Sequence, residues 1–227
     1  MIEQQLLVAK ARGVGDSAFL GEVPVSELIT GDALASAIGL TAGTAQHSNE
    51  PWLHFVDPVD GLTKYVAKKP YRSHISWDHL NAVNVVYGSR TLEINGETYR
   101  IRLLKGVNSD PYEGENGSDP VGAYGSEWNR LLYPLIPDPR YKPATGISGE
   151  GLVYGAWANY TEADLVMVDV GGNGRSSWCQ ETQSTNAAIR ILRGSDGVSP
   201  LSRTVAYVVS AVYGWRPVLE LVEKTGF

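Results

Sequence analysis

Cysteine is almost absent from this sequence: Cys179 is the only one among 227 residues. A single thiol cannot build a disulfide framework or a thiolate metal cluster within one chain. Stability must therefore come from packing, and the 43% of hydrophobic residues provide enough apolar side chains for a core. The composition is not that of a disordered chain.

Excess positive charge and long apolar runs are absent as well. The net charge is −6 and no cluster of lysine or arginine offsets it locally, so the chain would repel a phosphate backbone and we expect no nucleic-acid partner. No segment approaches the length of a membrane span, and we expect no membrane partner. The first ten residues contain acidic and amide side chains where a secretory signal would be basic, which predicts synthesis in the cytoplasm.

Short β-type segments separated by turn residues are abundant. Residues 90–94 and 98–104 flank Asn95-Gly96, a pair that suits the positive φ angles of a type I′ hairpin turn. Residues 51–70 predict a second hairpin around a turn at 58–61. In the first hairpin, the alternation places on one face the side chains of Tyr99, Ile101 and Leu103.

Two short helices are predicted. Residues 32–38 have a helical pattern that Gly39 stops. Ser126 is a good N-cap for a helix that extends to residue 133, with an acidic residue in its first turn. The position of Trp128 places it on the inward face of this helix, so we expect it to be buried.

The last fifty residues carry the most informative pattern. Residues 177–182 predict an aromatic-rich turn, and residues 193–197 predict a second turn that contains two glycines. Residues 207–213 and 215–222 then predict a hairpin-like end, in which the last strand buries the face that carries Trp215. Taken alone, these pieces equally fit a turn and a strand in any β-rich protein.

In their order, these C-terminal pieces resemble the end of the C-type-lectin-like fold. That fold occurs in formylglycine-generating-enzyme-like domains and in the paralogous domains of cellulolytic bacterial surface proteins. Residues 94–104 resemble the opening hairpin of those domains, and Gly125–Asn129 resembles their Glu-Trp helix start. The fold mostly serves recognition, and the resemblance implies the same for this chain.

A second resemblance concerns the preceding residues. The hairpin of Pro51–Phe55 and Tyr65–Pro70, followed by Ile75–Asp78, resembles segments that recur in virion structural proteins of tailed bacteriophages. In those proteins the segments precede the same lectin-like domain. We therefore predict an α+β, β-rich chain with an N-terminal assembly arm over 1–50, a β-hairpin over 51–70 and a C-type-lectin-like domain over 71–227.

The predicted arm is rich in glycine and small side chains but also carries apolar ones such as Leu6, Phe19 and Leu34. The glycines interrupt its elements, and the segment is too short to form a core of its own. We expect it to bury its apolar side chains on a neighbouring molecule, either a symmetry-related copy or the particle.

The resemblance also bears on catalysis. Oxidases of the formylglycine-generating family depend on a pair of cysteines that bind copper, whereas Cys179 stands alone and is expected to be a packed small residue. All four histidines precede residue 80, and no Gly-x-Ser-x-Gly nucleophile motif accompanies them. We therefore expect a non-enzymatic protein with no catalytic residue and no cofactor.

A calcium site is the metal site that the resemblance suggests, because many C-type lectins bind sugar through Ca²⁺. Residues 108–119 offer enough oxygen ligands for a hard cation, but they lack the EF-hand spacing and a Glu-Pro-Asn type of sugar-binding triplet. We expect a solvated acidic loop and no metal site, with a calcium site as the alternative. The glycine-rich residues 171–175 lack the Gly-Lys-Ser/Thr of a phosphate loop and predict a flexible loop.

In this fold the long loops between the helix and the final strands usually form the recognition surface. Aromatic side chains with asparagine and arginine are typical of protein interfaces and sugar sites, although tryptophan can equally belong to the core. The candidate recognition residues in these loops are Tyr141, Tyr154, Trp157, Tyr160, Asn173, Arg175 and Trp178.

These observations predict a non-enzymatic virion structural protein of a tailed phage or prophage, made in the host cytoplasm. It would be a capsid-decoration, collar, baseplate or tail component, because the chain lacks the heptad run or repeat that builds a fibre shaft. Its partners would be other virion proteins and, in a homo-oligomer, its own copies. The alternative is a receptor- or glycan-binding adhesion module of a tail fibre that recognises host surface polysaccharide.

Overall fold

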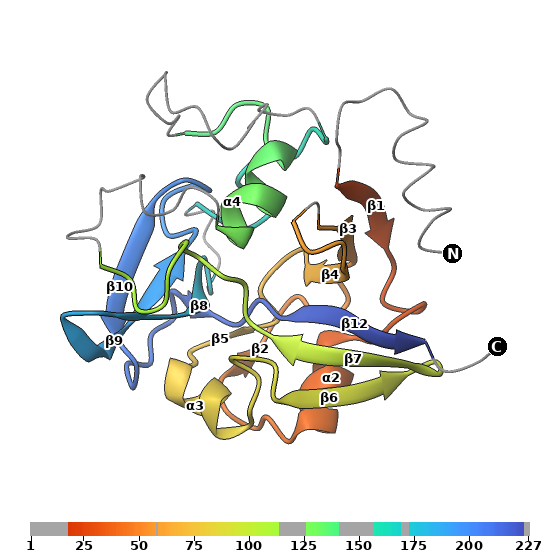
Figure 1. Cartoon of the computed structure of the whole chain (residues 1–227), viewed down its shortest axis with the longest axis horizontal. Helices are drawn as coiled ribbons and strands as arrows, with labels where there is room; N and C mark the ends of the chain where they lie inside the picture. The colour runs from red at the N-terminus through yellow and green to blue at the C-terminus, as the bar shows by residue number, and fades with distance from the viewer. Residues whose placement is uncertain (1–17, 58, 114–125, 141–156, 169–172, 225–227) are drawn as a thin grey trace.

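The computed structural model describes residues 18–57, 59–113, 126–140, 157–168 and 173–224. These residues form a β-rich α+β fold with short helices, as predicted (Figure 1). Among them, no helix has both the length and the apolar character needed to span a membrane.

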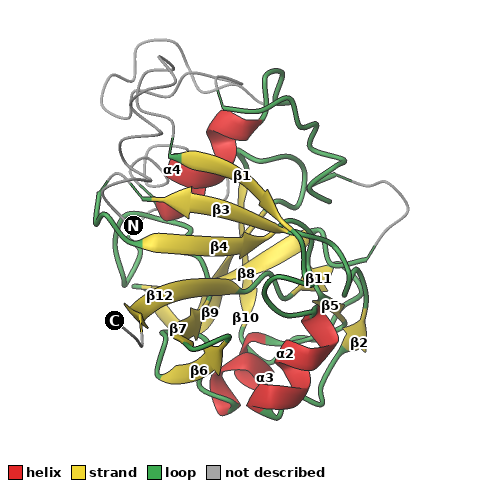
Figure 2. Ribbon diagram, turned by 90° about the vertical axis from the view of Figure 1, so that its right-hand side faces the viewer, coloured by secondary structure: helices red, strands yellow, loops and turns green. Residues whose placement is uncertain are grey.

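A six-stranded antiparallel sheet forms the centre of the molecule (Figure 2). Its strands come from all three predicted parts of the chain, and the closing strand lies between the two hairpins. In spatial order the strands are β1 (Phe19–Val23), β3 (Trp52–Val56), β4 (Thr63–Ala67), β12 (Val218–Lys224), β7 (Glu97–Arg102) and β6 (Arg90–Ile94).

A four-stranded sheet lies to the left of the first in Figure 1, and the described residues also form a two-stranded sheet. In the four-stranded sheet, β11 pairs in parallel with β8 and the other pairs are antiparallel. Its strands are β10 (Leu201–Val205), β9 (Asn186–Arg193), β8 (Ser176–Gln183) and β11 (Tyr213–Gly214). The two-stranded sheet consists of β2 (Thr44–Ala45) and β5 (Arg72–Ser73).

The helices contribute to two separate hydrophobic clusters. Side chains of α2 (Gly31–Ile38) and α3 (Trp77–Ala82) belong to the first cluster. Side chains of α4 (Glu127–Leu132) and the 3₁₀ turn η2 (Tyr133–Leu135) belong to the second. Figure 2 shows α2 and α3 together at one end and α4 at the opposite end.

Local sequence chemistry explains the turns and the helix ends. Asn95 and Gly96 have φ angles of 52° and 80° and join β6 to β7, which confirms the predicted hairpin. Gly39 ends α2 with a φ of 74°. The Oγ of Ser126 accepts a hydrogen bond from the backbone N–H of Asn129 (3.2 Å), which confirms the predicted N-cap of α4.

Strand alternation gives the six-stranded sheet two buried faces. Trp52, Ile101 and Leu219 lie in the first cluster with α2 and α3. Leu53 and Val218 point the opposite way and lie in the second cluster with α4. The face of β12 that carries Leu219 is buried, as predicted, and the opposite face with Val218 is buried as well, so β12 is covered on both sides.

Both tryptophans expected in the core, Trp128 and Trp215, are fully buried. The indole N–H of Trp128 donates to the carbonyl oxygen of Val198 (2.8 Å). The guanidinium carbons of Arg193 and Arg216 lie 5.6 Å and 5.9 Å from the centre of the Trp128 ring. The ring is thus held by one hydrogen bond and two cation–π contacts.

The described part of the N-terminal segment packs within the chain. β1 pairs with β3, and Leu34 and Ile38 of α2 lie in the first cluster. The indole N–H of Trp52 donates to the carbonyl oxygen of Ile29 (2.9 Å). For these residues the expectation of burial on another molecule does not hold, since the rest of the same chain covers them. Residues 1–17 of the predicted arm lie outside the described residues.

The C-terminal region differs from the prediction in two places. Residues 177–182, expected as a turn, belong to the buried strand β8. Residues 207–213, expected as a strand, contribute only Tyr213 to β11, and Tyr207 and Val209 are exposed. A β-branched run needs a partner strand, and the expected partner, β12, pairs instead with β4 and β7.

Candidate functional site

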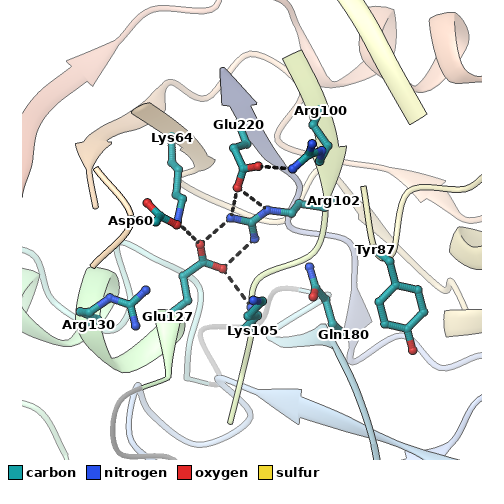
Figure 3. Close-up of a pocket in the computed structure, with 10 residues that line it drawn as sticks. All are labelled: Asp60, Lys64, Tyr87, Arg100, Arg102, Lys105, Glu127, Arg130, Gln180 and Glu220. Atoms are coloured by element: carbon teal, nitrogen blue, oxygen red, sulfur yellow. Dashed lines mark hydrogen bonds and ion pairs between the residues drawn. The ribbon is translucent and has the colours of Figure 1, made fainter. Parts of the chain in front are cut away.

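Charged side chains occupy the face of the six-stranded sheet that is turned toward α4. Arg100 and Arg102 project from β7, Glu220 from β12 and Lys64 from β4 (Figure 3). Because side chains alternate along a strand, all four point away from the first hydrophobic cluster. The first turn of α4 adds Glu127, which lies at the centre of the group.

Arg102 and Glu127 form the core of this charged group. The Nη1 of Arg102 donates to Oε2 of Glu127 (2.7 Å), and its Nη2 donates to Oε1 (2.5 Å). The Nε and Nη2 of Arg102 also donate to Oε2 of Glu220, at 2.9 Å and 2.8 Å. All three side chains are buried. This two-point pairing is the strong form of an ion pair, and it ties α4 to β7 and β12.

Lys64 ties the β3–β4 hairpin to the same group. Its buried Nζ donates to Oδ2 of Asp57 and to Oδ2 of Asp60, both at 2.6 Å, and lies 2.9 Å from Oε1 of Glu127. Arg130 of α4 donates from Nε and Nη2 to the two carboxylate oxygens of Asp57, at 2.9 Å and 2.6 Å. The ammonium group thus lies among three carboxylates, and Arg102 and Arg130 contribute the further positive charges that balance them.

The side chains of this charged group are stabilised in their ionised forms. Burial alone would raise the pKa of Glu127, but the charges and hydrogen bonds of Arg102 and Lys64 outweigh it and hold that pKa far below its usual range. Burial also opposes ionisation of Asp57, and its ion pairs nevertheless lower its pKa. The pKa values of Lys64 and Arg102 are raised in the same way, because neighbouring carboxylates outweigh the effect of burial.

The charged group borders a pocket of about 220 Å³ (Figure 3). Five lysine or arginine side chains and three carboxylates line it, and 5 − 3 leaves an excess of two positive charges. The lining residues are Asp60, Lys64, Tyr87, Arg100, Arg102, Lys105, Glu127, Arg130, Gln180 and Glu220.

Arg100 and Lys105 are the least committed cations of the pocket. Lys105 is exposed, and its ammonium group has no hydrogen bond or ion pair with any described residue. Arg100 is 42% exposed and donates from Nη1 to Oε1 of Glu220 (2.8 Å). Its aliphatic chain lies against Gly88, where a Cβ would be 2.3 Å from the Cδ of Arg100. The glycine therefore makes room for the arginine at the pocket.

Metal binding has limited support in the described part of the chain. There, no group of three or more histidine, cysteine, aspartate or glutamate side chains is arranged to hold a metal ion. Of the acidic loop at 108–119, residues 108–113 are described, and Asp110 accepts a hydrogen bond from the backbone N–H of Thr182 (3.0 Å). The rest of this loop lies outside the described residues, so the calcium alternative stays a prediction.

Among the predicted recognition residues, Trp178 lies in the core. Its side chain is buried, and its indole N–H donates to the carbonyl oxygen of Ile75 (2.8 Å). It therefore stabilises the fold and is not part of a surface. Tyr141 and Tyr154 lie outside the described residues.

The remaining predicted residues belong to two different segments. Trp157 and Tyr160 are half-buried against the second cluster, and the Tyr160 hydroxyl donates to Oε1 of Glu22 (2.5 Å). Asn173 is exposed and Arg175 half-buried in the loop before β8. None of the five described candidates lines the charged pocket.

The side chains of Cys179 and of two histidines take part in packing and helix capping. Cys179 is fully buried, as predicted, and burial raises the pKa of its thiol well above the ordinary value. The His54 ring stacks on Tyr65 with 4.5 Å between ring centres. His79 completes the capping box of α3 with Ser76. These groups are therefore occupied in packing and capping.

The pocket does not follow from the sequence pattern. In the sequence, Glu127 is an acid in the first turn of a helix and part of a Glu-Trp helix start, and the alternation of residues 98–104 defines the apolar face opposite Arg100 and Arg102. A strand with two arginines on its second face and a late strand with Glu220 were the available signals. Arg102 and Glu220 are 118 positions apart in the sequence, and no local rule connects them.

Comparison with known proteins adds no assignment. No protein-family model, curated protein or solved structure matches the chain.

Proposed function

We propose that this protein is a non-enzymatic structural component of a tailed-phage or prophage virion, with a lectin-like domain that is displayed for recognition. Capsid decoration, collar, baseplate and tail are the positions that this role covers. The virion part of the proposal comes from the sequence resemblance of the β3–β4 hairpin and the residues after it. The recognition part comes from the charged pocket.

One observation favours recognition over catalysis. The buried ionisable groups that border the pocket are paired with one another and keep fixed charges, whereas general acid–base catalysis needs a group whose pKa lies near the working pH. Fixed charges on rigid strands and a helix instead suit the binding of a ligand with complementary charge. The buried thiol of Cys179 has no access to a substrate.

The segments that carry the lectin-like resemblance are neighbours in space. The β6–β7 hairpin pairs with β12, and the ion pair of Arg102 with Glu127 joins α4 to both. Trp128 of α4 and Trp215 before β12 are both buried. These contacts support a lectin-like domain over most of residues 71–227, to which β1 and the β3–β4 hairpin are added at one side of the sheet.

Within the predicted arm, we place the attachment to the particle in residues 1–17. The residues from 18 onward are occupied by packing within the chain, as β1 and α2 show. The first seventeen residues contain the apolar run Leu6, Leu7 and Val8, which is suited to burial on a partner.

Immunogold electron microscopy of purified particles tests the virion assignment. Antibodies against the folded protein should label intact particles at one regular position. A tagged copy without residues 1–17 should remain folded but should not enter the particles, whereas a tagged full-length copy should enter them. Recovery of the full-length protein only in the particle-free soluble fraction would contradict the proposal.

A further inference from the structure

We propose that Asn95, in the turn between β6 and β7, is a site of spontaneous deamidation that detaches this hairpin from the segment before α2. The modification consumes only water and does not depend on the function proposed above. The observation behind it is a difference between Gly96 and the other glycines of the described chain that follow an asparagine or aspartate.

The chemistry follows from the covalent neighbours of the asparagine side chain. The backbone nitrogen of a following glycine can attack the Cγ of the asparagine, because glycine has no Cβ to hinder the approach. The nitrogen loses its proton to solvent, the bond from Cγ to Nδ2 breaks, and ammonia leaves a cyclic imide. Water then opens the imide at either of its carbonyl carbons and gives aspartate or β-linked isoaspartate.

Several places in the sequence have the neighbours that this reaction needs. Aspartate before glycine forms the same imide, with loss of water in place of ammonia. Asparagine or aspartate precedes glycine at Asn95, Asn116, Asn173, Asp60 and Asp196. Asn116 lies outside the described residues, and the other four can be compared in the structure.

Three of these four sites are protected by the fold. At each of them the N–H of the glycine donates to a backbone carbonyl oxygen. These bonds run from Gly61 to Asp57 (2.8 Å), from Gly174 to Ala211 (2.7 Å) and from Gly197 to Met167 (2.6 Å). A nitrogen that is held in this way can lose its proton and approach the side chain only when the structure opens locally.

Gly96 is the exception among the four. Asn95 and Gly96 are the central residues of the hairpin turn, and the strand pairing joins the residues on either side of them, Ile94 and Glu97. The N–H of Gly96 has no hydrogen-bond acceptor among the described residues, and Asn95 is exposed. Solvent therefore reaches both the attacking nitrogen and the amide without any opening of the fold.

Deamidation would break a contact between distant segments. The Nδ2 of Asn95 donates to the carbonyl oxygen of Glu27 (3.0 Å), in an exposed hydrogen bond that does not shield the amide. A carboxylate has no hydrogen to donate and repels that oxygen. Isoaspartate also lengthens the backbone of a tight turn that sets the strand register. The modification would therefore loosen β6, the edge strand of the six-stranded sheet, from the segment before α2.

Peptide mapping by mass spectrometry tests the site on the full-length protein, incubated in mildly alkaline buffer. Asn95 and Asn173 are compared within the same molecule, since glycine follows both. In the folded protein, deamidation of Asn95 should be about tenfold faster or more, because the N–H of Gly174 is protected. In urea, where this protection is lost, the two sites should react at similar rates.

A variant tests the effect on the contact. Asn95→Asp imitates the aspartate product and should raise hydrogen exchange of the backbone amides in residues 24–30 by roughly threefold or more. Asn186→Asp is the matched control. It adds the same charge at an exposed position but keeps its hydrogen bond, because the Oδ1 of Asn186 accepts from the N–H of Ala188 (3.0 Å). This control should leave the exchange of residues 24–30 unchanged.

Each part of the proposal has results that would overturn it. Equal rates at Asn95 and Asn173 in the folded protein, or an Asn95 that reacts only in urea, would remove the modification site. Unchanged exchange of residues 24–30 in Asn95→Asp, or the same increase in Asn186→Asp, would remove its effect on the contact with Glu27.

Discussion

The two faces of the central sheet are both covered, but the side chains that cover them differ in chemistry. On the face toward α2 and α3, side chains such as Trp52 and Leu219 form a continuous apolar cluster. On the face toward α4, Lys64, Arg102 and Glu127 form a buried network of ion pairs beside the second apolar cluster. Burial alone therefore does not distinguish the two faces.

The faces differ in what they require of their partners. Apolar packing tolerates exchanges of similar volume, because it has no single obligatory partner. A buried charge needs its partner at hydrogen-bond distance, and removal of one partner leaves the other uncompensated. We infer that the apolar face provides most of the stability, whereas the charged face fixes the positions of the two hairpins and α4 relative to one another.

The largest effect is expected on the apolar side. Trp215→Ala should lower the free energy of unfolding by about 3–5 kcal/mol, because it removes a fully buried indole and leaves a cavity. Urea denaturation followed by circular dichroism measures the change. Tyr207→Ala is the control, since Tyr207 is 69% exposed and should contribute little. A folded Trp215→Ala protein of unchanged stability would contradict this view of the core.

The second effect concerns the charged side. Lys64→Gln should cost about 3 kcal/mol, because it leaves three carboxylates without their shared cation, although Arg102 and Arg130 still pair with two of them. Lys69→Gln removes an ion pair that is partly exposed to solvent and should change stability by less than about 1 kcal/mol. Equal losses in the two variants would show that the buried network has no special role.

The pH dependence of stability should report on the buried charges of the face toward α4 and on Glu181 of β8. The folded-state pKa of Glu127 and Asp57 lies below the unfolded value, so their contribution is complete above about pH 4.5 and is lost as the pH falls below it. Glu181 acts in the opposite direction, because burial raises its pKa to about 8. Between about pH 4.5 and 8 it should lower stability as the pH rises, by up to roughly 1.4 kcal/mol per pH unit.

Melting temperatures measured from about pH 3 to about pH 9 test both effects, because this range includes the acid titration of Glu127 and Asp57 and the titration of Glu181. Glu181→Gln should abolish the loss of stability toward alkaline pH and keep the loss in acid. If the melting temperature fell equally steeply with decreasing pH in Glu127→Gln and in the unsubstituted protein, the role given to Glu127 would be contradicted.

The smallest effect is expected from calcium. The acidic loop at 108–119 has no recognisable ligand pattern, so addition of Ca²⁺ or of a chelator should leave the melting temperature unchanged. A metal that binds only the native state at a hundredfold excess over its dissociation constant would add about 2.7 kcal/mol. An upward shift of several degrees with Ca²⁺ would therefore show a site that the sequence pattern does not indicate.

The elements that could be predicted from sequence are those that local chemistry determines. The hairpin at Asn95-Gly96, the N-cap Ser126 and the helix end at Gly39 each depend on backbone preferences of one or two residues. Burial of Trp128 and Trp215 followed from size and spacing. These features need no knowledge of distant partners.

The elements that could not be predicted depend on pairing between distant segments. β12 has the pattern of a closing strand, but nothing in it specifies insertion between β4 and β7. The same insertion leaves residues 207–213 without a partner strand and places Glu220 next to Arg102. The candidate site arises from this pairing, which explains why its residues look like ordinary surface charges in the sequence.

The reactivity of Cys179 can be used to measure local opening of the folded protein. The thiol is the only one in the sequence, and it lies fully buried on β8, close to Arg193 and Gly106. A thiol reagent can reach it only when β8 separates from its neighbours. The rate of modification in native buffer would therefore measure how often the junction of the two sheets opens, with a single reactive site and no introduced label.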